Sequence, residues 1–293
     1  MNRFSCLVRG VIALFLSLPL LCIAQDLPLL NAFAHNDYQH KKPLFEALRN
    51  GYVNIEADVY AFKDKLVVTH VLPQIHHRRT LEDLYLAPLA GHITDKNGEI
   101  YTGYIEPVTL MIDIKSDPDK TYKLLKPLLE KYRNYLSGYS NGQWQAGPLR
   151  IVLSGNKPYK QLKNDPDRLA FIDEDLRRIT RDTSAGLFNM ASCKFSKLLR
   201  CKKDGTFSQR DEVRLRNYVE DAHRYGARVR LWSSPDKHTT WRQLLDCGVD
   251  LIVTDKLANL RDFLIKDKIP TMPTMAANEE EESELNYYTD TDN

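Results

Sequence analysis

The stretch GYVNIEADVYAFKDKLVVTH, residues 51–70, decides how the rest of this chain is interpreted. It contains two short apolar runs separated only by the polar triplet KDK, and each run has the length of a β-strand. The first run carries Glu56 and Asp58 near its end, and the second ends on His70. Alternate residues of a strand point to the same side, so Glu56 and Asp58 share one face. This stretch therefore predicts two strands that present titratable groups at their ends.

Apolar runs and amphipathic stretches alternate over the rest of the chain. The runs predict strands at 31–37, 53–60, 66–70, 109–114, 150–154, 169–172, 228–232 and 251–255. The 3.6-residue periodicity predicts helices at 43–50, 80–90, 121–136, 208–225, 237–247 and 257–266. Val-, Ile- and Leu-rich strands joined by helices are typical of a parallel sheet buried on both faces. Closing eight such strands gives an α/β fold, the TIM (β/α)8 barrel, with its chemistry at the carboxyl ends of the strands.

The second and third predicted strands depart from this scheme, since a parallel crossover needs a dozen or more residues. Only three residues separate them. Either the two strands pair as a hairpin, or one unit of the barrel has lost its helix. The barrel is therefore expected to be irregular at strands two and three. The region 174–207 shows no clear periodicity and is a candidate for a substrate-facing loop.

The two ends of the chain differ in composition from its centre. Residues 1–24 combine Arg3 and Arg9 with an apolar run, which predicts a signal peptide and a periplasmic or secreted protein. Lipid anchoring through Cys22 is the less favoured alternative, because the bulky Leu21 precedes it. Residues 25–268 are then the barrel domain, and 269–293 form an acidic tail predicted to be disordered.

Charge and hydropathy narrow the possible partners. The formal net charge of +2 is too small to suggest nucleic acid binding. After the leader, no apolar run is long enough for a transmembrane helix. The oligomeric state is left open.

Further titratable groups stand at the ends of other predicted strands. Asp113 would add a third carboxylate to Glu56 and Asp58, and three carboxylates suit a hard divalent cation, Mg²⁺ in the first place and Ca²⁺ as an alternative. His35 and His70 suit proton transfer, one as base toward the attacking hydroxyl and one as acid toward the leaving oxygen. The pattern thus predicts metal-assisted phosphodiester chemistry.

Three residues are candidates for substrate binding. Lys115 shares the face of Asp113 and can neutralise a phosphate oxygen, or it can form a salt bridge with that carboxylate. Asn36 adjoins His35, and Trp232 ends a strand where it would form a wall of the pocket. A lone histidine is more often a satisfied polar residue than a catalyst, so the assignment depends on the whole cluster.

These motifs resemble the phospholipase C-like phosphodiesterase superfamily of TIM barrels. Glycerophosphodiester phosphodiesterases carry a histidine near the first strand end, an E-x-D motif and a second histidine after a hairpin, which His35, Glu56-Ala-Asp58 and His70 match in order and spacing. The triplet Asp113-Ile-Lys115 is more similar to the sphingomyelinase D-like branch. The resemblance covers residues 31–265 and is nearest to bacterial homologues of the altered inheritance of mitochondria phospholipase C-like proteins.

Two departures from the glycerophosphodiesterase pattern affect what this resemblance implies. His35-Asn36-Asp37 stands in place of H-R-G, so the phosphate-binding arginine of that motif is missing. Lys42-Pro43-Leu44 stands in place of the P-E-N-T motif with its metal-binding glutamate. A calcium-dependent glycerophosphodiesterase is therefore in doubt, whereas a Mg²⁺ site of three acids survives both losses.

The function predicted from the sequence is a secreted, metal-dependent phosphoric diester hydrolase or lyase. Its substrates would be glycerophospho- or lysophospholipid-type phosphodiesters, small molecules or lipids, attacked either by water or by a neighbouring substrate hydroxyl. The alternative is a catalytically inactive barrel that binds phosphorylated or carbohydrate ligands. The two hypotheses make different predictions for Glu56, Asp58 and Asp113. In an enzyme these three carboxylates surround one cation, whereas in an inactive barrel, a relic of the enzyme, they form salt bridges.

Overall fold

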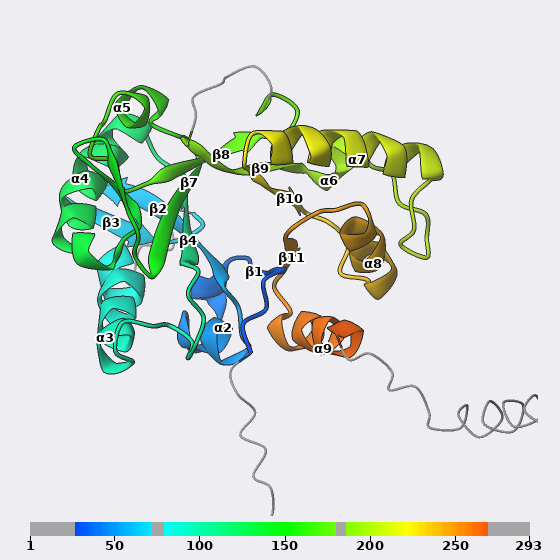
Figure 1. The fold of residues 1–293 in the computed structure, drawn as a ribbon, viewed down its shortest axis with the longest axis horizontal. Coiled ribbons are helices and arrows are strands. Elements are labelled where there is room, and N and C mark those ends of the chain that lie inside the picture. Colours follow the sequence, from blue (N-terminus) through cyan, green and yellow to red (C-terminus); the bar gives the residue numbers. More distant parts are fainter. Residues whose placement is uncertain (1–26, 72–78, 180–185, 269–293) are drawn as a thin grey trace, which may run out of the picture.

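A parallel β-barrel forms the centre of the computed structural model, which describes residues 27–71, 79–179 and 186–268 (Figure 1). Its strands are β1 (Ala32–Ala34), β2 (Asn54–Phe62), β4 (Val108–Ile114), β7 (Leu149–Gly155), β8 (Phe171–Asp175), β9 (Phe188–Lys194), β10 (Arg228–Trp232) and β11 (Ile252–Thr254). Hydrogen-bonded neighbours follow the order β10-β9-β8-β7-β4-β2-β1-β11. A parallel bridge between Arg230 and Leu251 joins the two ends of this order and closes the ring. The predicted TIM barrel is confirmed.

Helices surround this barrel (Figure 1). They are α2 (Phe45–Arg49), the π-helix η3 (Glu82–Leu86), α3 (Ala87–Asp95), α4 (Pro118–Lys131), α5 (Tyr159–Lys163), α6 (Phe195–Leu198), α7 (Gln209–Arg224), α8 (His238–Asp246) and α9 (Leu257–Lys268), with 3-10 turns η1 (Asp37–Gln39) and η4 (Arg133–Tyr135). Side-chain caps fix the start of the two longest: Asp117 accepts from the amide of Lys120 at α4, and Ser208 from that of Asp211 at α7.

Two apolar cores lie on opposite faces of the strands. In β4, Met111 points into the barrel, whereas Leu110 and Ile112 pack outward against the helices. The barrel interior is filled by Phe33, Met111, Val152, Phe171, Met190, Leu251 and Val253. Both faces of each strand are thus buried, which explains why these strands stand out in the sequence as continuous apolar runs.

The segment after β2 forms a hairpin, which decides between the two alternatives left open by the sequence. β3 (Lys65–Val68) pairs antiparallel with β2, from Phe62 opposite Lys65 to Val59 opposite Val68. Lys63 in the turn has a φ of 53°, as tight hairpin turns require. The prediction that 66–70 supplies one of the eight barrel strands was therefore wrong.

The eighth barrel strand is instead β9, which lies in the region where no strand was predicted. Its sequence, FNMASCK, mixes polar and small residues with apolar ones, so it lacks the apolar run of the other strands. A second hairpin, β5 (Gly138–Ser140) with β6 (Gln143–Gln145), was also not predicted. All six predicted helices correspond to helical segments of the structure.

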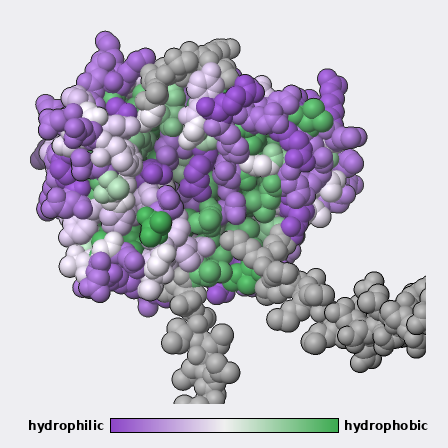
Figure 2. Space-filling model, viewed as in Figure 1, coloured by the Kyte–Doolittle hydropathy of each residue, from purple (hydrophilic) through white to green (hydrophobic). Residues whose placement is uncertain are grey.

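The surface seen in the same orientation is mainly polar. Figure 2 shows hydrophilic side chains over the outer faces of α4 and α7, with apolar groups gathered between them. Within the described residues, no helix combines the length and the hydropathy needed to cross a membrane. The predicted leader, 1–24, and the predicted tail, 269–293, lie outside the described residues.

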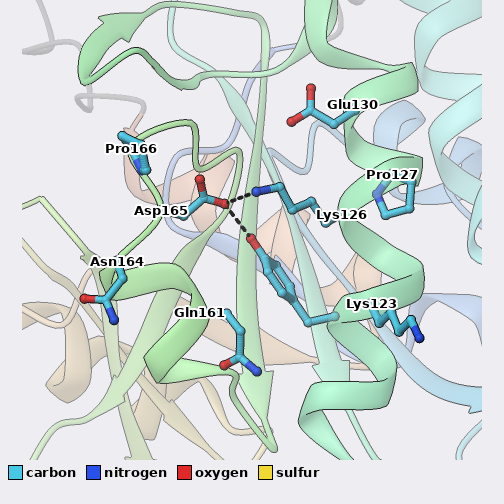
Figure 3. Close-up of a pocket in the computed structure, with 9 residues that line it drawn as sticks. Lys123, Lys126, Pro127, Glu130, Gln161, Asn164, Asp165 and Pro166 are labelled. Carbon is cyan, nitrogen blue, oxygen red and sulfur yellow. Dashed lines mark hydrogen bonds and ion pairs between the residues drawn. The ribbon is translucent and has the colours of Figure 1, made fainter.

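A cavity of about 680 Å³ lies on the flank of the barrel, between α4 and the end of α5 (Figure 3). Inside it Lys126 of α4 forms an ion pair with Asp165 at 2.6 Å, and the Tyr122 hydroxyl donates to the same carboxylate at 3.4 Å. These contacts join α4 to the loop after α5. The cavity is therefore a structural junction, distant in the fold from the strand ends where barrel chemistry collects.

The Asp165 contacts predict a pH-dependent contribution to stability. Burial raises the pKa of the Asp165 carboxyl, but Lys126, the Asp167 amide and Tyr122 outweigh it, so the net pKa is lowered. A carboxyl with a lowered folded pKa stabilises the protein above its unfolded pKa and loses that contribution as the pH falls. Asp165→Asn should lower the free energy of unfolding by about 1 kcal/mol at pH 7, measured by urea unfolding.

The difference between Asp165→Asn and the native protein should close below about pH 4, where the free carboxyl becomes protonated. The matched control is Asp95→Asn, since Asp95 is exposed at the end of α3. A constant difference from pH 7 down to pH 3 would show that the substitution acts through packing and not through charge.

Candidate active site

A cleft of about 530 Å³ opens at the carboxyl ends of the barrel strands. It is lined by His35, Glu56, His70, Asp113, Lys115, Ser154, Gly155, Lys157, Asp173, Glu174, Asp175, Arg177, Ser192, Cys193, Lys194, Lys197, Arg230, Trp232 and Ser233. Most of the residues singled out from the sequence are in this set. The exceptions are Asp58, which is buried beneath the surface of the cleft, and Asn36.

Three carboxylates come together at one side of this cleft. Glu56 and Asp58 project from β2, and Asp113 of β4 is the register partner of Asp58. One oxygen from each of the three carboxylates lies within 4.8 Å of the other two. The sequence therefore placed these three residues correctly beside one another.

The donor set fits a divalent cation. Asp113 Oδ1 is buried and, within the described part of the chain, has no hydrogen-bond partner. A Cβ added to Gly155, whose φ is +68°, would lie 2.1 Å from this oxygen, so glycine leaves room beside it. A buried carboxylate oxygen is costly without a partner, and hard cations prefer such oxygens.

The same carboxylates also contact cationic side chains. Lys115 Nζ lies 2.8 Å from Asp113 Oδ2 and 3.2 Å from Asp58 Oδ1. Burial lowers the pKa of Lys115, but these two carboxylates outweigh that effect and the net pKa is raised. Salt bridges are thus present, as the hypothesis of an inactive barrel requires, but they leave Asp113 Oδ1 without a hydrogen-bond partner among the described residues. The ammonium group is a donor positioned beside the acids, where a phosphate oxygen would be neutralised.

His35 follows β1 and is held by two acids. Its Nδ1 lies 2.7 Å from Asp255 Oδ1, and its Nε2 lies 3.6 Å from Glu56 Oε2. Burial lowers the pKa of His35, but Asp255 and Glu56 outweigh it, so the net pKa is raised. The Asn36 amide lies 2.9 Å from Nδ1 of the ring, so this residue, predicted to bind substrate, contacts the histidine.

His70 follows β3 and reaches the acid cluster from the hairpin. Its Nδ1 lies 2.5 Å from Asp58 Oδ2, and its side chain is 56% exposed. The Tyr38 hydroxyl donates to the same oxygen at 2.8 Å. Burial and the Asp58 charge raise the pKa of Tyr38, so the hydroxyl stays protonated and remains a donor. Each histidine is thus oriented by a carboxylate at Nδ1, an arrangement typical of proton-transfer residues.

A buried network behind the acid cluster was not predicted from the sequence. Arg230 of β10 is 3% exposed and lies 3.2 Å from Asp173 Oδ2 and 3.5 Å from Glu56 Oε1. Its Nε donates to Ser192 Oγ, which donates in turn to Asp173 Oδ1 at 2.6 Å. The guanidinium also stacks over the Phe33 ring at 4.4 Å.

This network gives the cleft an arginine that the H-R-G position lacks. Two-residue alternation in VRLW could have placed Arg230 inside the barrel, because Val229 and Leu231 pack outward. Nothing in the sequence shows that it would meet Glu56, 174 residues away. Asp255, the partner of His35, and Tyr38 were missed for the same reason.

Trp232 ends β10 at the cleft, 39% exposed, and so forms part of its wall as expected. The Nζ atom of Lys194, its register partner on β9, lies 5.6 Å from the indole centroid. A cation at this distance interacts favourably with the ring face.

The parallel barrel and the residues at its strand ends define the class of the protein, a phospholipase C-like phosphodiesterase fold. The sequence model of the AIM6-like phosphodiesterase domain matches residues 22–173, over half of the chain, and the chain belongs to this family. A second model, the glycerophosphoryl diester phosphodiesterase family, matches residues 228–258, which include β10 and β11.

The curated relatives of this chain carry names that match this family. Altered inheritance of mitochondria protein 6 of Eremothecium gossypii is 30% identical over 279 residues, covering 82% of this chain and 71% of the relative. The protein of the same name from Kluyveromyces lactis is 28% identical, covering 82% and 74%. A crystal structure of a glycerophosphodiester phosphodiesterase from Parabacteroides distasonis is 13% identical with a TM-score of 0.50, covering 81% of this chain and 97% of that one. At this identity the likeness shows the fold alone.

The comparisons contradict the predicted location. A periplasmic or secreted protein was expected from residues 1–24, with bacterial homologues as the nearest relatives. The named relatives found are altered inheritance of mitochondria proteins of yeasts and other fungi. The apolar and basic composition of the first residues was therefore a misleading guide to the location.

Proposed function

We propose that this protein is a phosphodiesterase that uses one divalent cation and a pair of histidines. The observation that carries the proposal is the arrangement of His35 and His70, each held at Nδ1 by a carboxylate, beside three acids in one cleft. The fold class and the family support phosphodiester chemistry at the coarse level. The proposed substrates are phosphodiesters of the glycerophosphodiester or lysophospholipid type, and the first of these agrees with the activity for which the structural neighbour is named.

The cation would be held by Glu56, Asp58 and Asp113, with Mg²⁺ as the first candidate. When bound, it would supply electrostatic stabilisation of the charge that develops on the phosphoryl oxygens. Asp113 Oδ1 is the oxygen most in need of such a partner, because it is buried and its other neighbours leave it unsatisfied. Lys115 would neutralise a further phosphoryl oxygen from the β4 side.

The histidines would carry the protons. One imidazole takes the proton of the attacking hydroxyl as the new P–O bond forms, and the other gives a proton to the leaving oxygen as the old P–O bond breaks. Asp255 and Asp58 fix the orientation of the two rings through their Nδ1 atoms. The attacking hydroxyl belongs either to water, which gives a phosphomonoester, or to the substrate itself, which gives a cyclic phosphodiester.

Phosphorus NMR of the products tests this function. Glycerophosphocholine, glycerophosphoinositol and lysophosphatidylcholine are incubated with the full chain, with Mg²⁺ and with EDTA. The expected result is a monoester or cyclic phosphate signal that needs Mg²⁺. No conversion of any phosphodiester, with binding of the same compounds intact, would favour the inactive barrel instead.

Glu56→Gln is expected to weaken Mg²⁺ binding by about tenfold or more, since it removes one anionic ligand while preserving the side-chain shape. Isothermal titration of the protein with Mg²⁺ measures this without any turnover. Glu174→Gln is the matched control, because Glu174 lines the same cleft and its carboxylate is instead bound by the Tyr159 hydroxyl. Equal Mg²⁺ affinity in the two variants would remove Glu56 from the metal site.

A further inference from the structure

Three lysines line the part of the cleft formed by β7, β9 and the start of α6, which follow β4 in the sheet order. Lys157 follows β7, Lys194 ends β9, and Lys197 lies in α6 directly after it. The proposed reactive groups come from β1, β2 and β4 of the ring and from the hairpin strand β3, on the other side of the boundary between β4 and β7. We call Lys157, Lys194 and Lys197 the lysine wall.

The other cations of the cleft are already neutralised. Arg177 binds Asp175 at 2.6 Å, Arg230 binds Asp173, and Lys115 binds Asp113. Among the described residues, no carboxylate lies within ion-pair distance of a lysine of the wall. The wall therefore offers three ammonium groups to whatever enters the cleft.

Local contacts hold part of the wall in position. The Lys157 ammonium donates to the main-chain oxygen of Asp173 at 2.8 Å and lies 5.7 Å from the Tyr159 ring centroid. Lys194 lies over the Trp232 ring. Ser233, which follows Trp232 in the chain, has a φ of 56°. A non-glycine residue in this conformation costs free energy, and such residues concentrate at binding and catalytic sites.

We propose that the lysine wall is an anion subsite for the substrate. It would bind a second phosphate or carboxylate group, carried on an alcohol of the phosphodiester that is cleaved at the histidines. This inference rests on the proposed function and specifies its substrate class: phosphodiesters with a further anionic group on one of their alcohols. Lysine ammonium groups bind such oxyanions as point charges.

The cleft geometry favours a substrate group over a membrane surface as the partner. The three lysines line the same 530 Å³ cleft as the histidines and carboxylates. A substrate that places its diester at the three-acid cluster would place a second anion toward β7 and β9, where the β8 carboxylates already have partners: Asp173 pairs with Arg230, Asp175 pairs with Arg177, and Glu174 accepts from the Tyr159 hydroxyl. The carboxylates of the cleft would repel a second anionic group, whereas the lysine wall would attract it. The charges of the cleft would therefore select substrates that carry such a group as well as attract them.

Two matched substrate pairs test the subsite. Glycerophosphoinositol 4-phosphate differs from glycerophosphoinositol by one phosphate, and glycerophosphoserine differs from glycerophosphoethanolamine by one carboxylate. The native protein with Mg²⁺ should prefer the more anionic member of at least the first pair by about tenfold in kcat/KM, mostly through KM, as two or three exposed charge pairs allow. The preference should shrink as salt rises from 50 to 500 mM.

The Lys194→Gln/Lys197→Gln variant should bring this ratio close to one. The control is Lys123→Gln/Lys160→Gln, which removes the same charge from α4 and α5, outside the cleft, and should keep the native ratio. The two substrate pairs distinguish phosphate from carboxylate. If the variant changes the kcat/KM ratio of the first pair alone, the lysine wall binds phosphate. If it changes the ratios of both pairs, the lysine wall binds anions in general.

Other outcomes overturn the subsite. Turnover of glycerophosphoinositol with the same ratio in native and variant protein would refute the lysine wall while leaving the proposed function intact. If none of the four compounds is turned over, the function fails, and isothermal titration with glycerophosphoinositol 4-phosphate then decides the wall by whether the double variant binds more weakly. A loss seen only in sedimentation with phosphatidylserine vesicles would identify a membrane surface instead.

Discussion

Replacing His35 with alanine is expected to lower kcat by about 10²–10⁴-fold with little change in KM, because a proton-transfer group acts mainly in the transition state. The native enzyme should show a bell-shaped dependence of rate on pH, with one limb for a protonated and one for a neutral group. The variant should lose one limb. Steady-state kinetics from pH 5 to 9 on a soluble phosphodiester would measure both effects.

His70→Ala should lose a similar factor, and the double variant should be scarcely worse than either single one, since the two residues act as a unit. His92→Ala is the control, because His92 lies on α3 and contacts the Ile100 carbonyl. A near-normal kcat in His35→Ala together with a large loss in His92→Ala would refute the assignment of the site. The proposed mechanism depends on this result more than on any other.

Arg230→Met is expected to lower the free energy of unfolding by about 3–5 kcal/mol, the usual cost of removing one partner of a buried ion pair. Asp173 and Glu56 are 3% and 4% exposed at the side chain, so both would lose their buried countercharge. Arg230→Lys should fall between the variant and the native protein, because one ammonium group cannot replace the guanidinium fork that meets both carboxylates and Ser192.

Urea unfolding followed by circular dichroism measures this loss. Arg214→Met is the matched control, since Arg214 pairs with Asp211 at 2.6 Å on the exposed face of α7. That pair should contribute no more than about 0.5 kcal/mol, as exposed i,i+3 pairs do. A loss below 1 kcal/mol in Arg230→Met would mean that the carboxylates are neutralised by other means, and that the arginine is dispensable to the barrel.

The sequence predicted those parts of the site that depend on local pattern. Glu56 and Asp58 share a face because strand residues alternate, and Asp113 joins them because β4 is the neighbour of β2 in the sheet. The apolar runs of these strands identified the barrel, since burial on both faces leaves a strong signal. Such features follow from one element or from two adjacent ones.

The parts that were missed depend on where distant elements meet. β9 gives no apolar run, because Ser192 and Lys194 face the polar end of the barrel. Arg230 meets Asp173 only because β10 and β8 flank β9, and Asp255 meets His35 only because β11 pairs with β1. Sequence periodicity fixes the direction of a side chain, but the partner depends on the order of strands around the ring.

The number of residue pairs in register differs from one strand pair of the ring to the next, and this difference affects where the cleft can open. Seven residue pairs in register join β4 to β7, whereas β10 and β11 meet at the bridge between Arg230 and Leu251. Sparse hydrogen bonding makes such a seam one of the places where local opening costs least, as at β1 and β2, which share the single register pair Ala34 and Ile55. On one side of this seam β10 ends in Trp232, beside Lys194 of β9. On the other side β11 is followed by Asp255, which contacts His35. Amide exchange along β10 and β11 should therefore report on the opening of the candidate active-site cleft as well as on the stability of the barrel.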